Sequence, residues 1–287
     1  MDPLMTQTLR MKGHPLPHSF SFSAYLCTLL KLSPTSLISI EPLDGGLTNH
    51  TVRAIFHQPI SLPSAPATIF SSVIVKHAPP YIASLGPAHA LSTKRQDIEA
   101  HVLGLFANAH EQAMELRLAA VARRHPNIRI PEILYHDKEN KIIIMSDLGR
   151  VPTLLNYLKS HSRVETLHSA TVLGNFLADL HCSTRGASEN MFQPFYNEEG
   201  SRAIQELIAS MPGKLLKAEA IPDAETLGRS VEQDMVSEKQ EWCFGMVDLW
   251  PGSVLIGEDF VGLVDWEYAG KSSAGSELGM LSVSTRL

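Results

Sequence analysis

The sequence has few of the features that mark a secreted, membrane-spanning or nucleic-acid-binding protein. It holds only 3 cysteines and no Cys-x-x-Cys pair, which argues against a disulfide framework or a zinc site. No apolar run approaches the ~18 residues needed to cross a bilayer, and residues 1–19 lack the apolar segment of a signal peptide. No basic block stands out in a chain with a net charge of -6. We therefore expect a cytoplasmic protein with reduced thiols that binds neither nucleic acid nor membrane.

Composition and length are those of a globular protein with a sizeable core. Hydrophobic residues make up 44% of the 287 and charged residues 19%, which suits one large domain or two lobes that share a cleft. Apolar stretches flank Gly45 and Gly46 in a hairpin-type turn, and a later strand ends at Lys76. Residues 94–124 have the apolar spacing of one long helix, and two more strands follow. We predict an antiparallel sheet, preceded by a short helix at residues 20–32.

Beyond residue 150 the pattern becomes helical. The stretch 165–184 carries apolar residues at helical spacing, and residues 201–219 and 223–240 are two further expected helices. The common apolar face of the first helix consists of Leu167, Ala170, Leu173, Leu177 and Leu180.

A second hairpin signal near the end of the chain brings two aspartates together. Short strands are expected at residues 254–256 and 261–264, with Asp248 before the first strand and Asp265 after the second, 17 residues apart. Because a hairpin returns the chain on itself, the two carboxylates can meet, and they must then bind a cation, share a proton or repel each other. The pattern therefore predicts a site at this hairpin.

The type of ligand follows from the oxygen atoms near these aspartates. Ser253 and Glu267 add a hydroxyl and a carboxylate within reach of the same point, and Mg²⁺ prefers oxygen ligands. The plainer alternative is that Asp248 and Asp265 each cap a turn, as aspartates beside proline and glycine commonly do.

The two segments around the aspartates, MVDLWPGSVL and VGLVDWEYAG, resemble the catalytic and metal-binding segments of the aminoglycoside phosphotransferase and choline kinase-like superfamily. Five upstream pieces occur in the order of that superfamily: LDGGLTNHTVRA, VIVKHA, DIEAHVLGLF, IIIMSDLG and LGNFLADLH. The resemblance spans about residues 40 to 281, and some features of the sequence are similar to those of methylthioribose kinase. It implies an α+β, two-lobed protein-kinase-like fold. The expected lobes are an antiparallel-sheet N-lobe at residues 1–145, with a disordered start, and a mostly helical C-lobe at residues 146–287.

The resemblance also implies an ATP-dependent phosphotransferase that moves the γ-phosphoryl group to a hydroxyl of a small molecule, with Mg²⁺ present. Asp248 would act as the catalytic base, Lys76 would contact the α- and β-phosphates, and Glu99 would hold Lys76. Taken alone, Lys76 and Glu99 would be assigned to the surface, where such residues are common. The implied nucleotide-binding residues are Gly45, Gly46, Asn49, Lys76, Glu99, Met145, Ser146 and Leu148, and the implied metal ligands are Ser253, Asp265 and Glu267.

Three departures from the superfamily pattern leave alternatives open. Met246 stands where relatives have histidine, Ser253 stands where they have asparagine, and the chain ends at Leu287, before the last helices of relatives. We expect a truncated C-terminus to impair activity. The alternatives are a non-catalytic nucleotide-binding protein or scaffold and a metal-dependent hydrolase that uses the same acids. The acceptor would be an amino sugar, an amino alcohol or a methylthioribose-like sugar, and its identity and the oligomeric state stay open.

Overall fold

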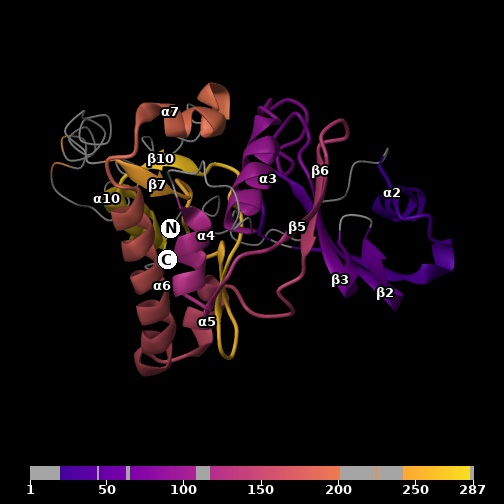
Figure 1. The fold of residues 1–287 in the computed structure, drawn as a ribbon, viewed down its shortest axis with the longest axis horizontal. Coiled ribbons are helices and arrows are strands. Elements are labelled where there is room, and N and C mark those ends of the chain that lie inside the picture. Colours follow the sequence, from indigo (N-terminus) through magenta and orange to yellow (C-terminus); the bar gives the residue numbers. More distant parts are fainter. Residues whose placement is uncertain are drawn as a thin grey trace.

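The N-terminal part of the chain forms an antiparallel sheet, and the C-terminal part is mostly helical (Figure 1). The computed structural model describes residues 20–43, 45–62, 65–107, 117–200 and 242–284, together with residues 223 and 226. The sheet has the strand order β1-β2-β3-β6-β5, which confirms the predicted antiparallel N-terminal sheet. Its strands are β1 (Leu37–Pro42), β2 (His50–Leu62), β3 (Ala65–His77), β5 (Ile133–Asp137) and β6 (Ile142–Ser146).

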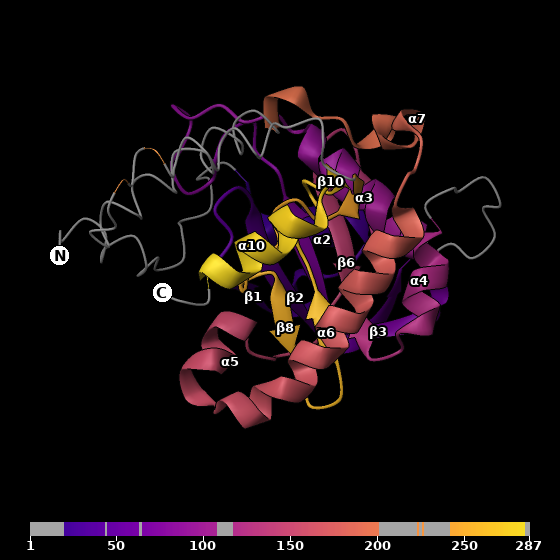
Figure 2. The same ribbon diagram turned by 90° about the vertical axis from the view of Figure 1, so that its left-hand side faces the viewer.

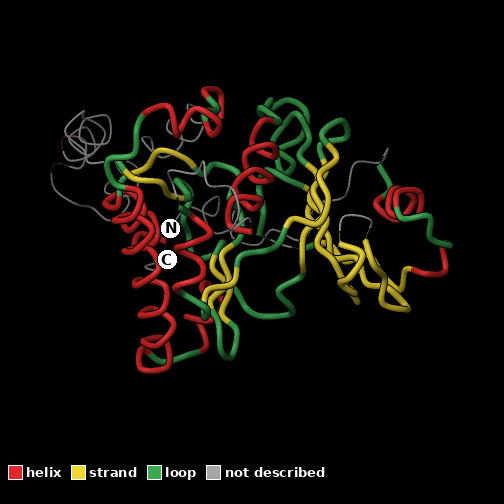
Figure 3. The backbone as a smooth tube through the Cα atoms, in the orientation of Figure 1, coloured by secondary structure: helices red, strands yellow, loops and turns green. Residues whose placement is uncertain are grey.

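Alternation along the strands gives this sheet two different faces. Val52 on β2 and Val75 on β3 pair directly and are both fully buried. They share a core with α2 (Phe22–Leu29), the helix predicted at residues 20–32. Because successive side chains of a strand point to opposite faces, Lys76 points away from α2. Figure 3 shows the sheet on one side of the molecule and most helices on the other.

The helix predicted at residues 94–124 is two helices. α3 (Lys94–Ala107) and α4 (Leu118–Arg124) are separated by residues 108–116, which lie outside the described part of the chain. Arg117, immediately before α4, has a left-handed backbone with a φ of 49°, which a continuous right-handed helix does not contain. The prediction of one helix was wrong because apolar spacing continues on both sides of the interruption.

The C-terminal region is organised around β7 (Cys243–Gly245), which contacts both α6 (Arg163–Thr184) and α10 (Ala274–Ser284). Figure 2 shows α6 and α10 on the side of the molecule that faces the viewer. The predicted hairpin is confirmed, because β8 and β9 pair antiparallel with Val254 opposite Leu263. The other elements are the 3₁₀ turns at Pro34–Ser36 and Gln193–Phe195, β4 (Ile128–Arg129), α5 (Leu154–Ser160), α7 (Glu189–Phe192), β8 (Val254–Ile256), β9 (Val261–Leu263) and β10 (Gly270–Ser272).

The apolar face of α6 is buried only in its second half. Leu167 is 65% exposed and Ala170 is also exposed, so the predicted face is wrong at its start. The helix meets its neighbours later in the chain, where the Phe244 amide donates to the Thr184 hydroxyl at 2.9 Å. The buried members of the predicted face are Leu173, Leu177 and Leu180.

Two predictions concern parts that the structure leaves undecided. The expected helices at residues 201–219 and 223–240 lie outside the described residues, apart from 223 and 226. β6 ends at Ser146, but the core around α3 includes Met145 as well as residues of the C-terminal region. The lobe boundary after residue 145 therefore stays a prediction. In the ranges that the structure describes, no helix has both the length and the apolarity to cross a membrane.

Candidate active site

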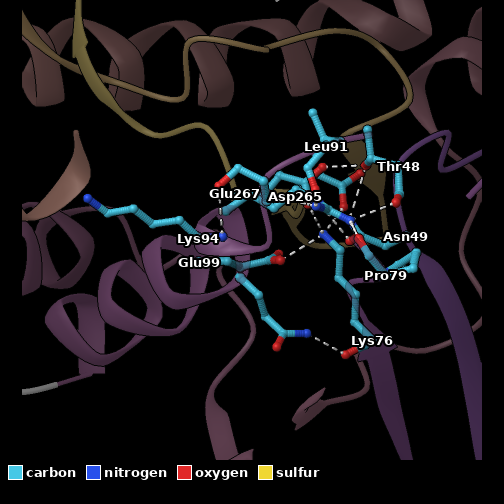
Figure 4. Close-up of polar contacts among 12 residues, drawn as sticks. Thr48, Asn49, Lys76, Pro79, Leu91, Lys94, Glu99, Asp265 and Glu267 are labelled. Atoms are coloured by element: carbon cyan, nitrogen blue, oxygen red, sulfur yellow. Dashed lines mark hydrogen bonds and ion pairs between the residues drawn. The ribbon is translucent and has the colours of Figure 1, made fainter. Parts of the chain in front are cut away.

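Lys76 lies at the centre of a buried group of charges (Figure 4). Its Nζ is 2.7 Å from a Glu99 oxygen, 2.8 Å from an Asp265 oxygen and 3.7 Å from a Glu267 oxygen. Burial would lower the pKa of Lys76, but the charges of Asp265, Glu267 and Glu99 outweigh it and raise the pKa well above its ordinary value. The lysine is therefore a permanent cation that links the sheet to two segments far away in the sequence.

Strand alternation and the packing of α3 bring Glu99 to this lysine. Lys76 pairs with Ile143 across β3 and β6, so the two side chains share a face of the sheet. Ile143 lies in one core cluster with Ile98 of α3, which brings the start of that helix onto this face. Both Lys76 and Glu99 are buried, with 3% and 2% of their surface exposed. The surface position expected for each residue when it is considered alone is therefore wrong. Burial raises the pKa of Glu99 to about 7, against the opposing effect of Lys76.

The segment after β9 turns sharply at Asp265. Asp265 has a φ of 66°, a left-handed conformation that is uncommon outside glycine and that aspartate tolerates better than most residues. The turn directs Asp265 and Glu267 to the same lysine. The Asp265 side chain is 36% exposed, whereas that of Glu267 is only 6% exposed.

Glu267 is held by the loop that follows the glycine pair. Its Oε1 accepts a hydrogen bond from the Thr48 hydroxyl at 2.5 Å, and its Oε2 accepts one from the Asn49 amide. The guanidinium of Arg95, which is completely buried, lies 3.8 Å from the same Oε2. Arg95 and Thr48 were absent from the sequence prediction, because an arginine in a helix and a threonine in a loop give no signal of burial.

Asp248, on the loop after β7, is much less constrained than Lys76. It is half-buried, and no hydrogen bond joins its carboxylate to another described residue. Burial, followed by the charges of Glu267, Asp265 and Glu277, raises the pKa of Asp248 to about 7. A carboxylate with a pKa near neutrality is suited to proton transfer at physiological pH.

The loop that carries Asp248 is held from behind by Glu277 on α10. Glu277 is completely buried and accepts hydrogen bonds from the amides of Met246, at 3.2 Å, and Val247, at 2.6 Å. Gly245 leaves room for it, since a Cβ there would lie 2.6 Å from the Glu277 carboxyl carbon. Val247 is left-handed, with a φ of 66°. At Met246, where relatives have histidine, the backbone amide makes the contact with Glu277 and the side chain is buried in the core.

Ser253 has a local role in the turn after Asp248. Its hydroxyl donates to the Trp250 carbonyl at 2.8 Å and accepts from the Trp250 amide at 3.2 Å. The residue is fully buried. The indole of Trp250 covers Gly252, where a Cβ would come within 2.1 Å of the ring. The hydroxyl predicted as a metal ligand is therefore engaged in closing this turn.

Three predicted nucleotide-binding residues, Met145, Ser146 and Leu148, form a linker segment at the end of β6. Ser146 exchanges hydrogen bonds with Glu132, whose carbonyl accepts from the Ser146 amide at 2.9 Å. The next residue, Asp147, accepts from Arg53 Nε and from the Ser72 hydroxyl, both at 2.7 Å. The linker is thereby attached to β2 and β3. Of the other predicted nucleotide residues, Met145 is buried, Leu148 lies against Gly262, and Gly45 and Gly46 are exposed in the loop before β2.

Of the three predicted metal ligands, Asp265 has the most accessible side chain, and the full set stays a prediction. Among the described residues, no group of three or more His, Cys, Asp or Glu could hold a metal ion. Mg²⁺ usually takes one or two carboxylates together with phosphates and water. Asp265, which is partly exposed and uses Oδ1 for Lys76, is the residue that fits this requirement. Ser253 and Glu267 are engaged within the protein.

Comparison with known proteins assigns this arrangement of residues to a family. The profile of the phosphotransferase enzyme family matches residues 99–286. The chain belongs to the phosphotransferase enzyme family. It is 26% identical over 263 residues to a 4-hydroxytryptamine kinase of Psilocybe cubensis, an alignment that covers 84% of this chain and 65% of the relative. It is 25% identical over 227 residues to a methylthioribose kinase of Geobacillus kaustophilus, with 72% of this chain and 52% of the relative covered. The chain thus spans less than two thirds of the length of these relatives.

Solved structures of the phosphotransferase family share the fold. The GDP complex of an aminoglycoside 2'-phosphotransferase-IIIa mutant gives a TM-score of 0.54 at 13% identity, covering 92% of this chain and 76% of that one. A choline/ethanolamine kinase family protein of Mesorhizobium loti gives a TM-score of 0.52 at 18% identity, covering 92% and 69%. The predicted α+β, two-lobed kinase-like fold is therefore confirmed.

Proposed function

We propose that this phosphotransferase-family protein transfers the γ-phosphoryl group of ATP to a hydroxyl of a small molecule. The observation that carries the proposal is the contact of Lys76 with both Glu99 and Asp265, at 2.7 and 2.8 Å. Phosphoryl transfer depends mainly on positioning and on neutralising phosphate charge. In this proposal Lys76 binds the α- and β-phosphates, Glu99 holds it in place, and the glycine-containing loop covers the nucleotide.

Asp248 is the proposed base. Its carboxylate takes the proton of the acceptor hydroxyl while that oxygen bonds to the γ-phosphorus and the bond to the bridging oxygen of ADP breaks. The pKa of about 7 supports this role, because the ionised and protonated forms are both accessible near neutral pH. We expect kcat to rise as the pH passes through about 7. Mg²⁺, when bound at Asp265, would neutralise phosphate charge.

The charge around Asp248 favours an acceptor with a cationic group. The carboxylates of Glu267, Asp265 and Glu277 all act on Asp248, which creates a negative potential at the acceptor side. Tyr268 adds a buried hydroxyl without a hydrogen-bond partner among the described residues. Burial is the main cause that raises the pKa of this phenol, followed by the charge of Glu267. Arg95 opposes the shift, and Asp248 adds to it. Amino alcohols and amino sugars are therefore the acceptors that we propose to test first. A hydrolase would have no use for the pairing of Lys76 with Glu99.

The test uses purified protein, nucleotides and a panel of hydroxyl compounds. We expect ATP or GTP with Mg²⁺ to raise the Tm, and ADP or GDP release to increase with hydroxylated amines more than with neutral sugars. Asp248→Asn should keep nucleotide binding but lower kcat by roughly 10²–10⁴-fold. Asp259→Asn, an exposed aspartate of the same hairpin, is the matched control and should retain activity. Turnover that survives Asp248→Asn would refute the assignment of the base, and a protein that binds no nucleotide would refute the function.

A further inference from the structure

The carboxylate of Glu267 joins the C-terminal region to the loop between β1 and β2. It follows β9 in the C-terminal region, yet both of its oxygens accept hydrogen bonds from the loop between β1 and β2. Thr48 donates to Oε1 and Asn49 donates to Oε2, and Lys76 of β3 lies 3.7 Å from Oε2 (Figure 4). Only Leu47 separates residues 48 and 49 from Gly45 and Gly46, so these hydrogen bonds reach the loop proposed to cover the nucleotide.

Arg95 determines which way the Asn49 amide faces. A guanidinium carries only donors, so its Nε must meet the Asn49 carbonyl oxygen, which it does at 3.2 Å. The Asn49 NH₂ group is thereby directed at Glu267, whose ionised carboxylate only accepts. Arg95 also donates to the carbonyls of Thr48, at 3.0 Å, and Pro79, at 2.8 Å. One buried side chain therefore holds both the Asn49 amide and the Thr48 carbonyl, and joins them to Pro79.

We propose that Glu267, Asn49 and Thr48 form an interlobe latch, with Arg95 as its positioning residue, and that the latch holds the glycine-containing loop over the nucleotide. The inference rests on the proposed function for its link to nucleotide affinity. It differs from the predicted role of Glu267 as a metal ligand, because the hydrogen bonds from Thr48 and Asn49 would hold the loop whether or not a cation is bound. The two roles make opposite predictions for nucleotide binding in the absence of metal.

The decisive variant is Thr48→Val, which removes one hydroxyl at nearly constant volume from a half-buried loop residue. We measure the Kd of ADP in EDTA by calorimetry, for wild type, Thr48→Val, Glu267→Gln and the double variant. The loss of a hydrogen bond to a charged group should weaken ADP binding by about tenfold in either single variant, with little further loss in the double variant. Thr48→Ser, which keeps the hydroxyl, should bring the Kd back to within about twofold of wild type.

The matched control is Thr171→Val, an exposed threonine of α6 whose hydroxyl, among the described residues, bonds to the Leu167 carbonyl of its own helix alone. It should leave ADP binding unchanged. Arg95→Met serves as a second variant, with KM for ATP expected to rise more than kcat falls. Unchanged ADP affinity in EDTA for Thr48→Val and Glu267→Gln would overturn the latch and favour the metal-ligand role.

A Tm measurement separates failure of the latch from failure of the proposed function. The Tm of the four proteins, measured without nucleotide or metal, reports directly on the hydrogen bonds of the latch. Non-additive Tm losses support the latch even if the wild type binds no ADP. A lack of ADP binding would refute only the proposed nucleotide function. Additive losses overturn the latch whatever the protein binds.

Discussion

The two sides of the site differ in how far their charged groups are already satisfied. On the proposed nucleotide side, Lys76 touches Glu99 and Asp265, and Glu267 is held by donors from the loop before β2. On the proposed acceptor side, Asp248 has no hydrogen-bond partner within the described ranges. Buried charges are stabilised by pairing, whereas an unpaired carboxylate remains available for proton transfer. The charges around Lys76 are therefore organised in advance, and Asp248, the carboxylate that we propose as the base, is left open.

The largest expected effect comes from removing Lys76, the cation that pairs with Glu99 and Asp265. Lys76→Met leaves Glu99, Asp265 and Glu267 close together without their shared cation. We expect the free energy of unfolding to fall by about 3–5 kcal/mol and kcat/KM to fall on the order of 10²-fold or more. Urea denaturation and steady-state kinetics measure the two effects.

The control for this variant is Lys271→Met. Lys271 forms an exposed ion pair with Glu189 at 2.8 Å, so its loss should change stability by no more than about 1 kcal/mol. If Lys76→Met were as stable and as active as this control, the paired side would not be the organising element of the site.

A smaller effect is expected from the support of the Asp248 loop. Glu277→Gln keeps the size of the side chain but turns an NH₂ group toward backbone amides that can only donate. We expect a loss of about 1–3 kcal/mol in stability and a lower kcat with little change in the KM for ATP, because the Lys76 group stays intact. Glu258→Gln, an exposed position of the β8–β9 hairpin, is the control. A KM for ATP that rises as much as kcat falls would show that the two sides are not independent.

A further expected effect is a pH dependence of stability that belongs to Asp248. Its pKa is about 7 in the folded protein and ~3.9 in the unfolded chain, so the folded state holds the proton more tightly. The resulting stabilisation is complete below the unfolded pKa and is lost as the pH rises through about 7. Without ligands, Asp248→Asn should therefore gain stability relative to wild type between pH 5 and pH 8, as measured by urea denaturation. Asp259→Asn should show no such trend, and a difference that stays constant with pH would contradict the raised pKa.

Local patterns predicted those parts of the fold that depend on neighbouring residues. The hairpin around Gly45, the β8–β9 hairpin and the strand ending near Lys76 follow from alternation and turn residues, and the structure contains all three. The same reasoning failed at residues 94–124 and at Leu167, where the outcome depends on a left-handed residue and on where a neighbouring element stops. The lobe boundary and the functional roles of the site residues remain predictions.

The missed residues share a physical cause. Arg95 and Thr48 become functional candidates only because α3 and the loop before β2 meet Glu267, which lies more than half the chain away. The role of Glu277 was missed for the same reason, because its bonds to Met246 and Val247 require α10 to pack behind β7.

The sequence alone determined the order of the elements, the residue types at the hairpin and the resemblance that pointed to a phosphotransferase, because these depend on spacing along the chain. Only the tertiary structure decided which charges are paired. Ion pairs and hydrogen bonds join Lys76 to Asp265, and Thr48 to Glu267, across most of the chain. Their strength depends on distance and burial, and neither quantity can be read from residue order.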